Sequence, residues 1–176
     1  MRKILVVNGS PRKSGNTDKL CRAFIEGAKQ AGHEVMYYPL SEYPINGCLG
    51  CESCLRTGKC VQKDAMASEI FNRLVECDTV VMASPVYCYM CTSLLKAFVE
   101  RTYPMSVLPM GRRKDAIMLS TAGAGGSVFA PLKEWHRANI GYIGWRDAGG
   151  VYAGGCGMSV PSRYLDEAKK LGASLK

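Results

Sequence analysis

The sequence has 176 residues, of which 47% are hydrophobic and 22% are charged, and its formal net charge is +8. This length predicts one domain over 1–176, and the apolar runs are too short for a membrane span or a signal peptide, so we expect a cytoplasmic protein that does not bind membranes. The basic residues are scattered, apart from the run Arg112, Arg113 and Lys114. No interaction with nucleic acid is therefore expected.

Strands and helices alternate along the chain, as judged from hydrophobic periodicity and from turn residues. The first strand is a run of four apolar residues that predicts a segment buried on both faces. In chain order, the pattern predicts strands at residues 4–7, 33–40, 78–84, 116–120 and within 142–152, and helices at residues 17–31, from 64 onward, 92–103, 127–140 and 161–174.

This alternation predicts an α/β fold, in which helices cover both faces of a doubly wound, five-stranded parallel sheet. Right-handed crossovers leave few topologies, and the strand order 2-1-3-4-5 fits five strands. In such a sheet, ligands bind beyond the carboxyl ends of the strands. The loops that follow the first, third and fourth strands are therefore expected to form the binding site.

The loop after the first strand has the composition of a phosphate-binding loop. Gly9 follows the strand, and a helix begins near Thr17, so backbone N–H groups at the helix start can bind an anion. The ATP-type and dinucleotide glycine fingerprints are absent. A monophosphate ester is the ligand that fits best. The side chains able to donate hydrogen bonds to it are Ser10, Arg12, Ser14, Asn16 and Thr17.

The other two loops carry groups that suit a planar ring. Tyr87 and Tyr89 follow the third strand and offer flat apolar faces with polar tips. The loop after the fourth strand is rich in glycine from Gly123 onward, which lets backbone N–H groups approach a flat ligand closely. Both loops are expected at the same sheet edge as the phosphate-binding loop.

These motifs resemble those of the flavodoxin-like NAD(P)H-dependent FMN reductases. The resemblance rests on the segments 9–17, 84–87 and 95–101, and the chain departs from the family pattern at Tyr89, where glycine is usual, and at Glu100, where aspartate is commoner. It implies FMN as cofactor and NAD(P)H as co-substrate, with the phosphate on the five residues of the first loop. It also implies a flavin ring on Pro85, Val86 and Tyr87, with Ser120, Thr121, Ala122 and Gly123 along another edge.

A cysteine-rich loop at residues 41–63 separates the second strand from the next helix. Its cysteines, Cys48, Cys51, Cys54 and Cys60, can converge on one centre. Ferredoxins use runs of this kind for [4Fe–4S] clusters, and the spacing resembles that of the iron–sulfur flavoproteins, a branch of the same group. A cluster, free or redox-active thiols, and zinc remain three interpretations of this loop.

The sequence thus predicts an FMN-dependent oxidoreductase that moves electrons from NAD(P)H or a reduced protein carrier to a small acceptor such as flavin or quinone. We expect no catalytic side chain, because the flavin carries the chemistry. The alternatives are a flavodoxin-like electron carrier without its own substrate and a cysteine-based redox or metal sensor. A ferredoxin-like carrier is the expected protein partner, and the resemblance implies a homodimer or homotetramer.

Overall fold

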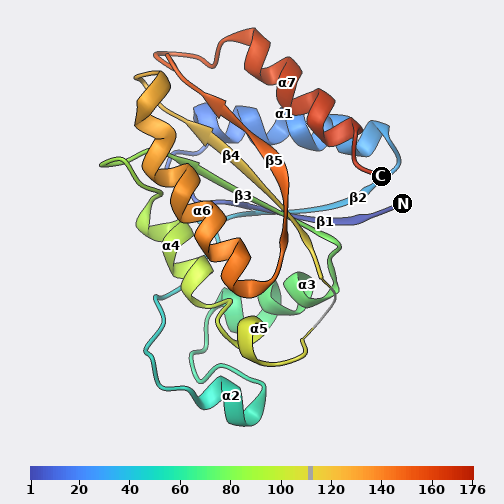
Figure 1. The fold of residues 1–176 in the computed structure, drawn as a ribbon, viewed down its shortest axis with the longest axis vertical. Coiled ribbons are helices and arrows are strands. Elements are labelled where there is room, and N and C mark those ends of the chain that lie inside the picture. Colours follow the sequence, from blue (N-terminus) through green and yellow to red (C-terminus); the bar gives the residue numbers. More distant parts are fainter. Residues whose placement is uncertain (111–112) are drawn as a thin grey trace.

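The computed structural model describes residues 1–110 and 113–176, and it contains one five-stranded parallel sheet (Figure 1). The strand order is β2-β1-β3-β4-β5, which confirms the predicted topology. All four strand pairs are parallel. The strands are β1 (Lys3–Asn8), β2 (Glu34–Pro39), β3 (Thr79–Pro85), β4 (Asp115–Thr121) and β5 (Arg146–Ala153).

Helices cover both faces of the sheet, as predicted. One face carries α1 (Asn16–Gln30) and α7 (Ser162–Ala173), and the other carries α3 (Phe71–Glu76), α4 (Ser93–Glu100) and α6 (Ala130–Ile143) (Figure 1). None of the described helices is both long and apolar enough to cross a bilayer. The short elements are α2 (Ser53–Thr57), the π-helical turn η1 (Met66–Ile70), α5 (Pro104–Val107) and the 3₁₀ turn η2 (Gly126–Phe129).

Strand β1 shows why the sheet needs two layers of helices. Ile4 and Val6 join the apolar cluster beneath α1 and α7, whereas Leu5 and Val7 join the cluster on the opposite face. All four side chains are fully buried. Alternate residues of a strand point to opposite faces, so a continuous apolar run requires cover on both sides.

Two segments differ from what the sequence pattern predicts. The segment 41–63, predicted to be a loop throughout, contains the five-residue helix α2. The basic run does not form an exposed patch among its described members, because Lys114 is fully buried and its Nζ donates to the carbonyls of Val75 and Cys77 (3.0 and 2.6 Å). Arg112 lies outside the described residues.

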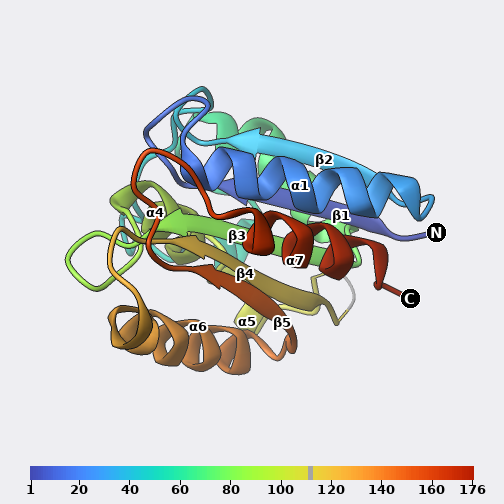
Figure 2. The same cartoon turned by 90° about the horizontal axis from the view of Figure 1, so that it is seen from above.

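Two glycines allow α1 and α7 to pack closely side by side (Figure 2). A Cβ atom on Gly27 would lie 1.9 Å from the Lys169 carbonyl oxygen, and one on Gly172 would lie 2.2 Å from the Phe24 carbonyl oxygen. Both obstacles are backbone atoms, so no side-chain rotation could relieve the clash. The contact between the two helices therefore depends on the absence of these Cβ atoms.

Replacing Gly27 with alanine should therefore lower the free energy of unfolding by about 1–3 kcal/mol, the usual cost of overpacking. Urea denaturation followed by circular dichroism measures this change. Gly141→Ala is the matched control, because Gly141 lies within α6 and a Cβ there meets nothing within 4 Å. The control should gain about 0.5–1 kcal/mol from helix propensity. Equal stability of the two variants would contradict the packing argument.

His136 is a buried polar residue on α6. It is 2% exposed, and among the described residues neither ring nitrogen has a hydrogen-bond partner. Burial lowers the pKa of His136 below its ordinary value of 6.5, although the nearby Asp147 carboxylate acts in the opposite direction. The folded protein therefore holds this imidazole neutral, while the unfolded chain binds a proton as the pH falls.

Stability should consequently fall as the pH drops below 6.5 toward the lowered pKa of the folded state. The slope from this one proton is at most about 1.4 kcal/mol per pH unit. His136→Leu should flatten the dependence between pH 7 and pH 5, and Asp147→Asn should steepen it, as measured by urea denaturation across that range. A slope unaffected by His136→Leu would show that another group is responsible.

Candidate functional site

A cavity of about 340 Å³ opens at the carboxyl ends of the strands. Its walls come from the loops after β1, β3, β4 and β5, which meet at one edge because the strands are parallel. Every residue predicted to contact the phosphate or the flavin ring lines this cavity except Ser120. These lining residues are Ser10, Arg12, Ser14, Asn16, Thr17, Pro85, Val86, Tyr87, Thr121, Ala122 and Gly123.

The predicted phosphate-binding loop, residues 9–17, is shaped by its own side chains. Asn8 Oδ1 accepts the Ser10 N–H (2.9 Å), and Ser10 Oγ accepts the Arg12 N–H (3.2 Å). These two bonds turn the chain sharply after β1 and leave Arg12 exposed at the cavity. A network below the loop holds Asn8 in place, because its Nδ2 donates to the Tyr37 hydroxyl (2.8 Å), which in turn donates to Asp18.

The start of α1 closes the loop and links it to its neighbours. Gly15 is the N-cap residue, without a side-chain cap, so the backbone N–H groups of the first turn remain available to an anion. The Thr17 and Thr121 hydroxyls share a hydrogen bond (2.8 Å) that joins the start of α1 to the end of β4. Asn16 Nδ2 donates to the Gly157 carbonyl (3.1 Å) in the loop after β5.

Helix α4 supports the phosphate-binding loop from behind. The Thr92 hydroxyl caps α4 by accepting the Leu95 N–H, and it also donates to the Gly9 carbonyl (2.6 Å). A Cβ on Gly9 would lie 2.7 Å from the Leu95 Cβ, so only glycine permits this approach. The loop and the helix are thus fixed to each other at this point.

The loop after β3 is a tight hairpin beside the cavity. Val86 N–H donates to the Thr121 carbonyl (2.9 Å), and Tyr87 and Met90 exchange two backbone bonds of 2.9 Å. The turn residues Cys88 and Tyr89 have positive φ angles of 49° and 64°, the conformation of a two-residue hairpin turn. Glycine adopts such angles without strain, and glycine is the usual family residue at position 89. Tyr89 forms the same turn, but its backbone is strained because it carries a side chain.

Ser120, predicted to lie along the edge of the flavin, does not line the cavity. Its side chain is fully buried between two strands, and its Oγ donates to the Ser84 carbonyl (2.9 Å). The next residue, Thr121, faces the cavity instead, as the alternation of side chains along a strand requires.

Five lining residues were not predicted. Cys156, Gly157 and Met158 come from the loop after β5, where Gly154 and Gly155 already mark a turn at a strand end. Ligands bind beyond the carboxyl ends of parallel strands, and this rule, applied also to the loop after β5, would have predicted these three residues. The other two are Gly15 and Lys19, at the start of α1.

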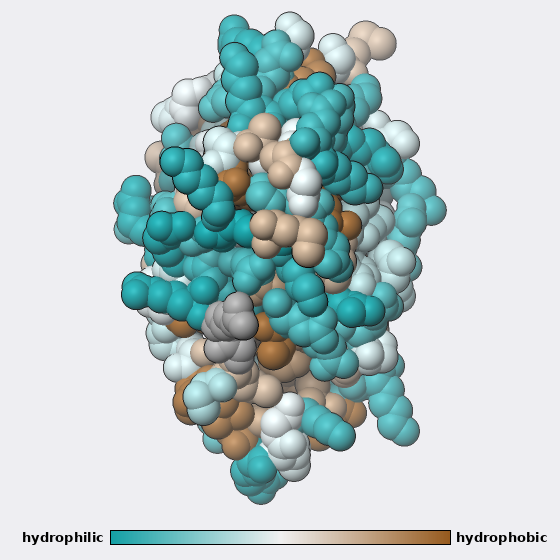
Figure 3. Space-filling model, turned by 90° about the vertical axis from the view of Figure 1, so that its right-hand side faces the viewer, coloured by the Kyte–Doolittle hydropathy of each residue, from teal (hydrophilic) through white to brown (hydrophobic). Residues whose placement is uncertain are grey.

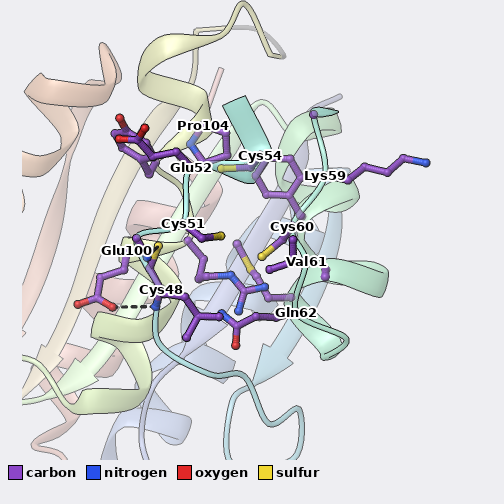
Figure 4. Close-up of a pocket in the computed structure, with 18 of the residues that line it drawn as sticks. Cys48, Cys51, Glu52, Cys54, Lys59, Cys60, Val61, Gln62, Glu100 and Pro104 are labelled. Atoms are coloured by element: carbon purple, nitrogen blue, oxygen red, sulfur yellow. Dashed lines mark hydrogen bonds between the residues drawn. The ribbon is translucent and has the colours of Figure 1, made fainter. Parts of the chain in front are cut away.

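A second cavity, of about 630 Å³, lies under the cysteine-rich loop. Cys48, Cys51, Cys54 and Cys60 all line it (Figure 4). Much of the remaining wall is apolar and includes Met66, Phe71 and Pro104. Hydrophobic surface also gathers toward the lower end of the face in Figure 3, the end at which Figure 1 draws α2 and α5.

The four thiols are close enough to influence one another. Burial raises the pKa of Cys54, and the charges of Cys60, Cys48 and Cys51 raise it further. The Gly50 N–H donates to Cys48 Sγ (3.4 Å), a bond that stabilises a thiolate. Among the described residues, no three His, Cys, Asp or Glu side chains stand close enough to hold a single metal ion. The four thiols instead surround a wider space.

The remaining cysteines do not join this group. Cys88 is exposed at the hairpin tip, and Cys91 is half-buried, with its pKa raised by burial to about 11. Burial also raises the pKa of Cys77 to about 11. Thiols with raised pKa values are poor nucleophiles, so their positions favour packing over redox chemistry.

Comparison with known proteins agrees with this geometry. The family described as NADPH-dependent FMN reductase matches residues 2–138. An iron-sulfur flavoprotein of Archaeoglobus fulgidus is 34% identical over 98% of this chain and 78% of its own length. An iron-sulfur flavoprotein of Methanosarcina thermophila is 32% identical over 72% of this chain and 62% of its own length. A Bacillus subtilis relative, described as a putative NAD(P)H-dependent FMN-containing oxidoreductase, is 30% identical over 56% of this chain and 49% of its own length.

Solved structures support the fold. The NAD(P)H:quinone oxidoreductase of Methanothermobacter marburgensis superimposes with a TM-score of 0.81 at 19% identity and covers 99% of this chain and 96% of its own. An azoreductase of Bacillus anthracis gives a TM-score of 0.76 at 17% identity over 99% of this chain and 100% of its own. Together with the family match, these comparisons show that the chain is a flavodoxin-like oxidoreductase that belongs to the NADPH-dependent FMN reductase family.

Proposed function

We propose that this chain is a cytoplasmic FMN-dependent oxidoreductase that takes electrons from NAD(P)H or a reduced protein carrier and passes them to a small acceptor such as a flavin or a quinone. The observation that carries this proposal is the cavity at the sheet edge, where an anion-binding loop and a loop with a flat aromatic side chain meet. Its volume of about 340 Å³ lies within the usual range of cofactor sites.

The chemistry of the donors fits a phosphate ester at one end of this cavity. Arg12 and Lys19 line the cavity, and none of its described lining residues is acidic. The hydroxyls of Ser10, Ser14 and Thr17 and the N–H groups at the start of α1 would hold the phosphate.

The other end of the cavity fits a flat ring. Pro85, Val86 and Tyr87 would support one side of the ring, and Thr121, Ala122 and Gly123 would lie along its edge. The described lining residues include no His, Asp or Glu, the side chains that most often act as general acids or bases. When bound, FMN supplies both two-electron exchange with a nicotinamide and one-electron exchange with a metal centre.

We further propose that Cys48, Cys51, Cys54 and Cys60 hold a [4Fe–4S] cluster. Four thiols around one cavity are the ligand set of such a cluster, and relatives named iron-sulfur flavoproteins support the assignment. A cluster exchanges single electrons, so it would let the protein deal with a one-electron protein donor such as a ferredoxin-like carrier. Zinc and free thiols are the alternatives.

The surroundings of the two cavities are consistent with the proposed acceptor and assembly. Tyr87 and Met158 are exposed at the mouth of the first cavity and offer apolar contacts to a flat acceptor. Leu49 and Val61 are exposed beside the second cavity and would be covered in a homodimer or homotetramer.

Steady-state oxidation of NAD(P)H with an added quinone separates the enzyme from a pure electron carrier, which would turn over little.

The phosphate assignment is tested by the double variant Arg12→Ala/Asn16→Ala. Each lost hydrogen bond to a charged group removes about 1.5–3 kcal/mol, so the dissociation constant for FMN should rise about 100-fold or more. Fluorescence titration of the apoprotein with FMN measures it. The control Lys13→Ala/Gln30→Ala also removes one cation and one amide, both outside the cavity lining, and should bind FMN normally. Normal FMN affinity in the first variant would refute the assignment.

The cluster assignment is tested by Cys54→Ser. This change should remove most of the iron and acid-labile sulfide while FMN content stays the same, because Cys54 does not line the FMN cavity. Iron assay and the absorption spectrum of protein purified without oxygen measure both. Cys88→Ser is the control, since Cys88 is exposed and lines neither cavity. Iron equally high in both variants would rule out a cluster on this loop.

A further inference from the structure

The two ends of the cysteine-rich loop are tied together at its base. The Asn46 N–H donates to Asp64 Oδ2 (2.9 Å), and Gln62 Nε2 donates to the Gly47 carbonyl (2.8 Å). These bonds join residues 18 and 15 positions apart in the sequence. The segment that carries all four cysteines therefore leaves and rejoins the protein at one place.

Arg101 lies at the centre of this junction. Its Nη1 and Nη2 donate to the two carboxylate oxygens of Asp64 (2.8 and 3.1 Å), and Nη1 also donates to the Asn46 carbonyl (3.0 Å). The side chains of Arg101 and Asp64 are only 3% and 6% exposed. A two-point pair of this kind fixes direction as well as distance, so Arg101 determines where both ends of the loop lie.

Glu100 adds a bond to the first cysteine. Its Oε2 accepts the Cys48 N–H (3.1 Å), and its Oε1 accepts Lys96 Nζ (2.7 Å). The backbone of Cys48 is therefore attached to the C-terminal end of α4, next to Arg101. Glu100 and Arg101 both line the cavity that the four thiols surround, and Figure 4 draws the bond from Cys48 to Glu100.

The same helix supports the other cavity at its opposite end. Thr92, the N-cap of α4, donates to the Gly9 carbonyl of the phosphate-binding loop. The eight residues of α4 span about 12 Å at 1.5 Å per residue. One short helix thus holds a loop of each cavity.

We propose that Asp64, Glu100 and Arg101 are positioning residues that hold the four cysteines as a preformed cage for the cluster. This inference rests on the proposed cluster. The three residues do not ligate iron themselves. They fix the backbone of Cys48 and the two ends of the loop, so that the thiols face one cavity before any metal is bound, and less ordering is required when the cluster assembles.

The test combines two measurements on the full chain carrying Arg101→Met. Hydrogen exchange before cluster reconstitution should become faster for the amide of Asn46, because its acceptor, the Asp64 carboxylate, loses the two bonds from Arg101 that hold it in place. Iron affinity on anaerobic reconstitution should fall about 10- to 100-fold, as for other partners that orient metal ligands. Arg101→Lys keeps the charge and should recover part of both losses. FMN affinity should be unchanged.

Two further variants separate positioning from general stability. Gln62→Ala removes one bond at the base of the loop from a partly exposed residue, and it should show the same two changes to a smaller degree in a folded protein. Arg146→Met is the control, because it breaks another two-point arginine pair, with Asp115 (2.7 Å for both bonds), at a position on β5 outside the cysteine-rich loop. The control should load iron normally.

The outcomes distinguish this inference from the proposed function. If the unmodified chain takes up no iron, the proposed cluster fails, and the positioning role fails with it. If the unmodified chain loads iron and Arg101→Met loads it with the same affinity, only the positioning role is overturned. Unchanged exchange of the Asn46 amide in Arg101→Met would equally overturn it.

Discussion

Parallel pairing of β1 with β3 is the constraint on which the cofactor cavity depends. The two strands run in register to Asn8 and Ala83, and the Gly9 N–H extends the pairing by donating to the Ala83 carbonyl (2.8 Å). In the same way, the Val86 N–H extends the pairing of β3 with β4 by donating to the Thr121 carbonyl (2.9 Å). Three loops therefore leave the sheet side by side, and residues from distant parts of the sequence form one cavity.

Helix α4 extends this order to the cysteine-rich loop. Its N-cap holds the phosphate-binding loop through Gly9, and the residues at its C-terminal end hold Cys48, Asn46 and Asp64. The loop follows β2, at the edge of the sheet, and these bonds add to the packing of Tyr43 and Ile45 against the core. A single helix thus gives the two cavities a fixed common support.

Much of this arrangement could be predicted from local signals. Apolar runs and turn residues indicated the five strands and their order, and the composition of the loop after β1 indicated residues that line the cavity at the sheet edge. Features that depend on contacts between residues distant in the sequence could not be predicted. Ser120 bonds to a neighbouring strand, and the contacts of Arg101 cross 37 and 55 positions, so no window of sequence contains them. Helix α2 has five residues, too few to show a helical period.

The central claim is that one chain binds FMN at the sheet edge and a [4Fe–4S] cluster under the cysteine-rich loop. Its most direct test is the visible absorption spectrum of the chain purified without oxygen, with iron and sulfide measured on the same sample. We expect a flavin spectrum on a broad absorption that dithionite bleaches, with about four irons per chain. A flavin spectrum without iron would contradict the cluster, and no bound flavin even after addition of FMN would contradict the whole account.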